Sequence, residues 1–106
     1  IAETGGQNAM VVDSTALLET VVDDVLSSAF NSAGQRCSAL RVLFVQQDIA
    51  EPLITMLVGA MRELRIGDPA DLATDIGPLI DRATLDRGVS CHTIVPASVA
   101  RSVQLD

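Results

Sequence analysis

The sequence predicts an α/β fold in which a helix connects two parallel strands and further helices flank them. Short apolar runs at residues 9–12 and 40–45 are typical of buried strands. Between them, apolar residues recur at steps of three and four, which indicates a helix packed on one face. A strand, helix, strand order favours a right-handed crossover, and therefore parallel strands.

The first strand, residues 9–12, is bounded by polar residues on both sides. Asp13 or Ser14 is expected to cap the following helix, which should end near residues 31–34. The apolar stripe of this helix consists of Leu17, Leu18, Val21, Val22, Val25, Leu26, Ala29 and Phe30.

The second strand, residues 40–45, is rich in Val, Leu and Phe. Asp48 is expected to open the next helix, with Glu51 completing a capping-box-like start and Pro52 in the first turn, where its missing N–H does no harm. The stripe of this helix consists of Ile49, Leu53, Ile54, Leu57, Val58, Met61 and Leu64. A turn-rich connection over residues 67–81 then leads to another helix.

The composition restricts the function classes. Among 106 residues there are seven Arg and no Lys, the net charge is −7 and aromatics make up 2%, which disfavours nucleic-acid binding. No apolar run approaches the roughly 20 residues that a membrane helix needs. With no signal peptide and two cysteines without regular spacing, we expect a reducing, cytoplasmic protein. The 48% apolar content favours a homo-oligomer or burial against further polypeptide.

Two short segments carry the chemistry. Glu3 stands before Thr4 and two glycines, and Cys37 lies in the small polar loop Gly34-Gln35-Arg36-Cys37-Ser38. A carboxylate and a thiol suit a general base and a nucleophile. Taken alone, a cysteine is more often a small buried apolar residue, and Glu3 could be an ordinary carboxylate at a strand end.

Together and in this order, the two segments resemble the aldehyde dehydrogenases, which place an E-[LT]-G-G motif before a G-Q-x-C motif. The stretches Gln7-Asn8-Ala9-Met10 and residues 32–41 resemble most the 1-pyrroline-5-carboxylate dehydrogenase module of bifunctional proline-utilisation proteins. The resemblance implies a βαβ piece of the catalytic domain of an NAD(P)-dependent enzyme. The reaction that it implies is the oxidation of L-glutamate γ-semialdehyde to L-glutamate.

The resemblance also implies roles for individual residues. Cys37 would add to the aldehyde and carry a thiohemiacetal and then a thioester, with its own N–H as half of an oxyanion site. Glu3 would activate the hydrolytic water, and Thr4 and Gly5 would lie at the cofactor. Ser38 would contact the substrate, although a loop-stabilising hydroxyl is an equal alternative. NAD(P) belongs to the longer parent, and none is expected on this chain, because its nucleotide-binding fold lies outside the window.

The match covers residues 1–87, and we expect residues 88–106 to be an unmatched tail. The chain opens on Ile1 and is far shorter than a family member, so we expect a piece of something larger, either an excised domain or a truncated gene. The chain alone is then expected to be inactive. The alternative is a non-catalytic remnant or captured gene cassette that forms a small αβ oligomer.

The remaining polar groups have plainer interpretations. For Arg36 and Arg41 we favour salt bridges to carboxylates over contact with an acidic substrate. Cys91-His92 resembles half of a metal site, but adjacent residues seldom face one metal and the chain has no other His, so no metal is expected. Asp23-Asp24 and residues 68–75 lack the alternating oxygen ligands of a calcium loop.

Overall fold

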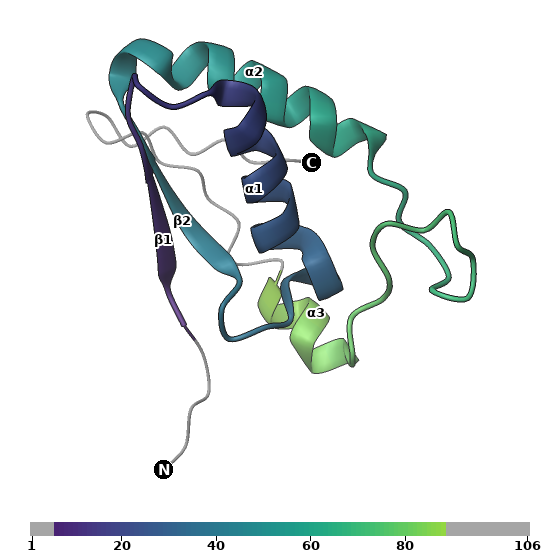
Figure 1. Cartoon of the computed structure of the whole chain (residues 1–106). Helices are drawn as coiled ribbons and strands as arrows, with labels where there is room; N and C mark the ends of the chain where they lie inside the picture. The colour runs from purple at the N-terminus through teal and green to yellow at the C-terminus, as the bar shows by residue number, and fades with distance from the viewer. Residues whose placement is uncertain (1–5, 89–106) are drawn as a thin grey trace.

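A computed structural model describes residues 6–88, and Figure 1 shows the arrangement of their elements. The order is β1 (Asn8–Val12), α1 (Leu18–Phe30), the 3-10 turn η1 (Asn31–Gly34), β2 (Leu40–Val45), α2 (Gln47–Glu63) and α3 (Arg82–Gly88). The two strands pair in parallel, with Met10 opposite Leu43 and Val12 opposite Val45. The predicted α/β fold with a helix between parallel strands is therefore confirmed.

The core lies between one face of the sheet and the two long helices. In Figure 1, α1 runs alongside the strands and α2 crosses beside it. Leu53 of α2 is fully buried, and Leu57 is 4% exposed. The buried cluster consists of Val12, Val21, Val22, Val25, Leu40, Leu53 and Leu57. Most positions of both predicted apolar stripes face this core, as amphipathic helices on a sheet should. Leu17 is the clearest exception, since it is 67% exposed, and Phe30, Ile54, Val58 and Leu64 also lie outside the cluster.

The other face of the sheet is apolar and exposed among the described residues. Side chains alternate along each strand, so Val11 and its register partner Phe44 point away from the core. Val11 is 79% exposed, Phe44 45% and Val42 39%. A face of this kind is typical of a sheet that is covered by further polypeptide.

The helix α1 begins later than the sequence predicted, and neither Asp13 nor Ser14 caps it. Its N-cap is Leu17, which makes no capping side-chain bond. Asp13 instead closes a local turn, because its carboxylate accepts from the Thr15 N–H at 2.9 Å and its carbonyl accepts from the Ala16 N–H. Asp and Ser compete for such local bonds as readily as for caps. The predicted end of this helix near residues 31–34 is confirmed, since α1 ends at Phe30 and η1 follows it.

The start of α2 also differs from the prediction. The helix begins at Gln47, directly after β2, so Asp48 does not open it and Pro52 lies inside the helix rather than in its first turn. The chain turns at once because the Gln46 N–H still bonds the Val12 carbonyl of β1, while the Gln46 carbonyl already accepts from the Ile49 N–H. The proposed capping box is therefore wrong, because a backbone link between strand ends fixes this helix start.

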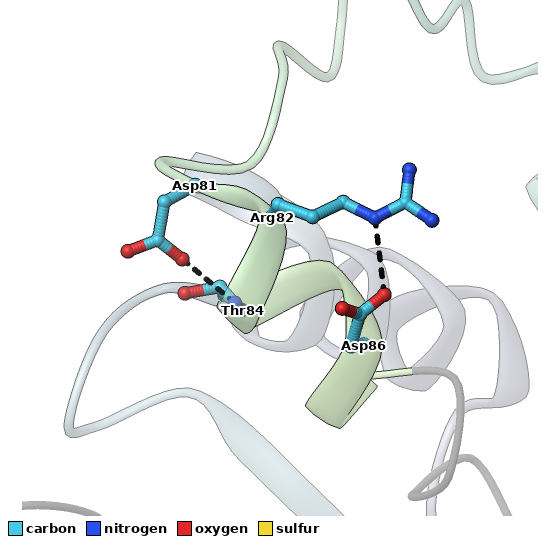
Figure 2. A network of polar contacts seen from close by, with 4 residues as sticks. All are labelled: Asp81, Arg82, Thr84 and Asp86. Atoms are coloured by element: carbon cyan, nitrogen blue, oxygen red, sulfur yellow. Dashed lines mark hydrogen bonds and ion pairs between the residues drawn. The ribbon is translucent and has the colours of Figure 1, made fainter.

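Residues 64–81 form the turn-rich connection that the sequence predicted, and α3 follows it. Asp81 caps α3 by accepting the Thr84 N–H at 2.7 Å, as Figure 2 shows. Along α3, Arg82 and Asp86 form an ion pair at 3.1 Å, also drawn in Figure 2. Both side chains are well exposed, so this pair contributes little to stability.

No helix within residues 6–88 combines the length and the apolar character that crossing a bilayer requires.

Candidate active site

Cys37 lies at the corner of a tight turn just before β2. The Ala39 N–H bonds the Arg36 carbonyl at 3.1 Å, which leaves Cys37 and Ser38 as the two central residues of a β-turn. Cys37 is a free, exposed cysteine, whereas the next residue after the turn, Ala39, is fully buried. The alternative interpretation of Cys37 as a buried apolar residue is therefore wrong, and the thiol is accessible to a small electrophile.

The approach to this turn is an unusual stretch of backbone. Ser32, Ala33 and Gly34 have φ values of 57°, 53° and 67°, three successive residues in the left-handed region. For residues with a Cβ this conformation costs roughly 1–2 kcal/mol each. The Gln35 N–H bonds the Ser32 carbonyl at 3.0 Å, and the Arg41 guanidinium bonds the Gly34 carbonyl at 2.6 Å. These bonds hold the sharp change of direction between α1 and the cysteine turn.

Among the described residues, Arg36 and Arg41 bind backbone carbonyls and no carboxylate. The Arg36 Nη2 donates to the carbonyls of Ser27 and Ser28 at 3.0 and 3.1 Å, at the C-terminal end of α1. A cation there satisfies unpaired carbonyls and complements the helix dipole. Over residues 6–88 the ion pair of α3 is the sole salt bridge, so the predicted salt bridges of both arginines are not formed there.

Gln35 connects the cysteine turn to a distant part of the chain. Its Oε1 accepts from the Ile80 N–H at 2.7 Å, and its Nε2 lies 3.4 Å from the Pro78 carbonyl oxygen and 3.1 Å from that of Ser32. One carboxamide therefore joins the left-handed stretch to the segment that precedes α3. We call this set of contacts the Gln35 bridge.

The N-terminal segment meets the same turn from the other side. Asn8, the first residue of β1, donates from Nδ2 to the Cys37 carbonyl at 2.7 Å and to the Ala39 carbonyl at 3.1 Å. Next to it, Gly6 lies so close that an added Cβ would be 2.6 Å from the Cys37 carbonyl oxygen. The segment that follows the glutamate motif and the cysteine turn are thus in direct contact.

The structure describes only some of the predicted site residues. Cys37 and Ser38 share the exposed turn, whereas Glu3, Thr4 and Gly5 lie outside the described residues, so their proximity to Cys37 stays a prediction. Within residues 6–88 no three metal-ligating side chains gather. The pair Cys91-His92 also lies outside the described range.

The structure adds residues to which sequence reasoning gave no role. Asn8 and Gln35 stand inside the two motifs, but apart from Ser32 their partners lie 29 to 45 residues away along the chain. A polar residue at the start of an apolar strand was the one available signal for Asn8.

Comparison with known proteins adds to this geometry. The model of the aldehyde dehydrogenase family matches residues 1–103. The chain belongs to the aldehyde dehydrogenase family. The match extends past residue 87, where the sequence placed the start of an unmatched tail. That boundary stays a prediction, since residues 89–106 lie outside the described range.

Curated relatives of this aldehyde dehydrogenase chain include the bifunctional protein PutA of Salmonella typhimurium, which is 64% identical over 92 residues. That match covers 84% of this chain and 7% of PutA. The 1-pyrroline-5-carboxylate dehydrogenase of Geobacillus thermodenitrificans is 38% identical over 87 residues, covering 82% of this chain and 17% of that enzyme. The predicted resemblance is confirmed, and the chain spans less than a fifth of either relative.

Solved structures give the same result for the fold. A Bradyrhizobium japonicum proline utilization A variant superposes with a TM-score of 0.78 at 48% identity, over 93% of this chain and 12% of that one. A Thermus 1-pyrroline-5-carboxylate dehydrogenase with bound NAD gives a TM-score of 0.75 at 33% identity, over 83% and 17% of the two chains. The α/β arrangement is therefore that of an aldehyde dehydrogenase.

Proposed function

We propose that this chain carries the nucleophile of an aldehyde dehydrogenase whose substrate is L-glutamate γ-semialdehyde and whose product is L-glutamate. The observation that carries the proposal is the exposed Cys37 thiol at the corner of a turn that is tied to β1, α1 and the segment before α3. The substrate is taken from relatives with PutA and 1-pyrroline-5-carboxylate dehydrogenase names. We further propose a cytoplasmic location.

In this proposal Cys37 performs the covalent chemistry. Its sulfur adds to the aldehyde carbon, and the Cys37 backbone N–H donates to the oxygen that becomes negative. After oxidation the acyl group stays on sulfur as a thioester. Glu3 takes a proton from water, the water attacks the thioester carbon, and the carboxylic acid leaves as the thiol is restored. We assign Ser38, which follows the nucleophile in the same turn, to contact with the substrate, with a loop-stabilising hydroxyl as the alternative.

We assign NAD(P) binding to the longer parent protein and not to this chain alone. NAD(P), when bound there, accepts the hydride of the oxidation. We assign Thr4 and Gly5 to the cofactor, and both lie outside the described residues. We expect no NAD reduction by this chain alone, because it spans less than a fifth of the enzymes that it matches. Saturable NAD binding in calorimetry would contradict that expectation.

The thiol and the base can be tested without the cofactor, because hydrolysis of an activated ester needs only a nucleophile and activated water. We expect Cys37→Ser to abolish whatever p-nitrophenyl acetate hydrolysis the chain retains above background, and Glu3→Gln to slow the release of the acyl group. Cys91→Ser removes the other cysteine of the chain and serves as the matched control. Equal hydrolysis by the chain and by Cys37→Ser would refute the role of Cys37.

A second function is favoured by the exposed apolar face of β1 and β2. In a chain without the rest of its parent, this face would drive self-association into a small αβ homo-oligomer, with or without residual chemistry. Sedimentation over a wide concentration range tests this alternative. A compact monomer throughout would refute it.

A further inference from the structure

The Cys37 carbonyl points away from its own turn and bonds a side chain of β1. In a β-turn the peptide between the two central residues points its oxygen away from the closing hydrogen bond, which here runs from the Ala39 N–H to the Arg36 carbonyl. Because this carbonyl is exposed, water is the alternative to a protein donor, so a protein donor matters for where the peptide is held rather than for avoiding an unpaired group. Because this peptide follows the nucleophile, the partner that it finds also fixes the ψ angle of Cys37.

The strand ladder does not provide that partner. The register of β1 and β2 breaks between Asn8 and Ala9, since Asn8 is opposite Leu40 and Ala9 is opposite Val42, which leaves Arg41 without a counterpart. The Asn8 carboxamide spans this irregularity. Its Nδ2 carries two hydrogens and lies 2.7 Å from the Cys37 oxygen and 3.1 Å from the Ala39 oxygen.

Gly6 makes the contact between the two segments a close one. A Cβ at this position would lie 2.6 Å from the Cys37 oxygen and 3.1 Å from the Asn8 Nδ2. Real Cβ atoms do not approach so closely, so only glycine fits beside this hydrogen bond. Glu3 stands three residues earlier, and three residues of chain reach at most about 11 Å.

From these contacts we infer that Asn8 is a positioning residue, whose carboxamide holds the Cys37 carbonyl and keeps the segment that bears Glu3 against the nucleophile turn. The inference rests on the proposed function for the roles of Glu3 and Cys37. Asn8 itself touches neither substrate nor cofactor in this account. Its side-chain donor, not its size, is the property that matters.

The test measures proximity rather than activity. In the Cys91→Ser background, Glu3→Cys provides a thiol that can form a disulfide with Cys37. The value of [GSH]²/[GSSG] at half oxidation gives the effective concentration of one thiol at the other. Two protein thiols and oxidised glutathione give the protein disulfide and two reduced glutathiones. We expect Asn8→Ala to lower this effective concentration about tenfold, from the loss of two hydrogen bonds. The isosteric Asn8→Asp, which faces two carbonyls without a donor, should lower it further.

Controls separate this role from general destabilisation. Asn31→Ala removes the other asparagine of the chain, which bonds only Ser27 at 3.4 Å and should leave the effective concentration unchanged. The Cys37 carbonyl carbon shift in NMR should move in both Asn8 variants and stay in Asn31→Ala. If Asn8→Ala loses its far-UV circular dichroism, Gly6→Ala decides instead, because it crowds the Cys37 carbonyl without touching the core.

The outcomes distinguish the two proposals. A high effective concentration that Asn8→Ala leaves unchanged, with an unmoved Cys37 carbonyl shift, overturns the positioning role. A low effective concentration before any change at Asn8 overturns the proposed pairing of Glu3 with Cys37, and with it the part of the inference that concerns Glu3. A moved carbonyl shift would then still assign the Cys37 hydrogen bond to Asn8.

Discussion

Replacing Gly34 by alanine should destabilise the chain for two independent reasons. Its φ of 67° lies in the left-handed region, where a Cβ costs about 1–2 kcal/mol. The added Cβ would also stand 2.8 Å from the Ala29 carbonyl oxygen, which belongs to the backbone of α1 and cannot rotate away. Relieving such overpacking costs roughly 1–3 kcal/mol. We therefore expect a loss of about 2–5 kcal/mol in the free energy of unfolding.

The matched control is the same substitution at Gly59. This residue lies within α2, and no atom would come within 4 Å of its added Cβ. Alanine there should stabilise the chain by about 0.5–1 kcal/mol, because glycine loses more backbone entropy on folding. The two Gly to Ala changes are thus expected to have opposite signs, although they are chemically identical.

The assay is urea unfolding followed by far-UV circular dichroism, since the chain has neither Trp nor Tyr for fluorescence. Each kcal/mol corresponds to about 4–8 °C in Tm for a domain of this size, so the thermal midpoint of Gly34→Ala should lie at least 8 °C below that of the unsubstituted chain. A Gly34→Ala variant as stable as the unsubstituted chain would show that the left-handed backbone at Gly34 is not required for the cysteine turn.

The other predictions concern the core, one carboxylate and the sheet face. Leu53→Ala, at a fully buried position, should cost about 3–5 kcal/mol in urea unfolding, whereas Leu72→Ala at an exposed position should change little; equal effects would contradict the core described above. Hydrogen bonds from the Thr15 hydroxyl, and secondly from the Thr15 N–H, hold the pKa of Asp13 below 3.8. The ionised Asp13 therefore stabilises the fold above pH 3.8, and this stabilisation is lost as the pH falls through the lower pKa of the folded state. Thr15→Val should raise the Asp13 midpoint in a carboxyl NMR titration toward 3.8, and an unmoved midpoint would reject the hydroxyl as the cause. Phe44→Lys should lower any self-association seen by sedimentation without changing circular dichroism, and unchanged association would place the contact elsewhere.

Elements with a strong local pattern could be predicted from the sequence. Both strands and both long helices follow from apolar spacing, because one buried face per element is enough to fix their type. Helix starts could not be predicted, because they depend on competition between bonds. Asp13 forms a turn with Thr15 instead of a cap, and the start of α2 is fixed by a bond from Gln46 to Val12 across the sheet.

The candidate site, too, could be predicted only in part from the sequence. The motif around Cys37 identifies the family without any structure, since it is a property of neighbouring residues. The roles of Asn8, Gln35 and Arg36 depend on carbonyls supplied by other elements, so no local pattern contains them. The preference for salt bridges at Arg36 failed for this reason, because the sequence shows charges but not which carbonyls remain unpaired at the end of a helix.

The Gln35 bridge has a consequence for the order in which the protein is made. Gln35 reaches the ribosome exit long before Pro78 and Ile80, so the nascent chain can pair its strands and bury α1 and α2 while this carboxamide still lacks its two later partners. The cysteine turn is therefore among the last parts of this chain to mature during translation. A nascent chain arrested before residue 78 would carry Cys37 on a turn that lacks the Gln35 bonds to Pro78 and Ile80.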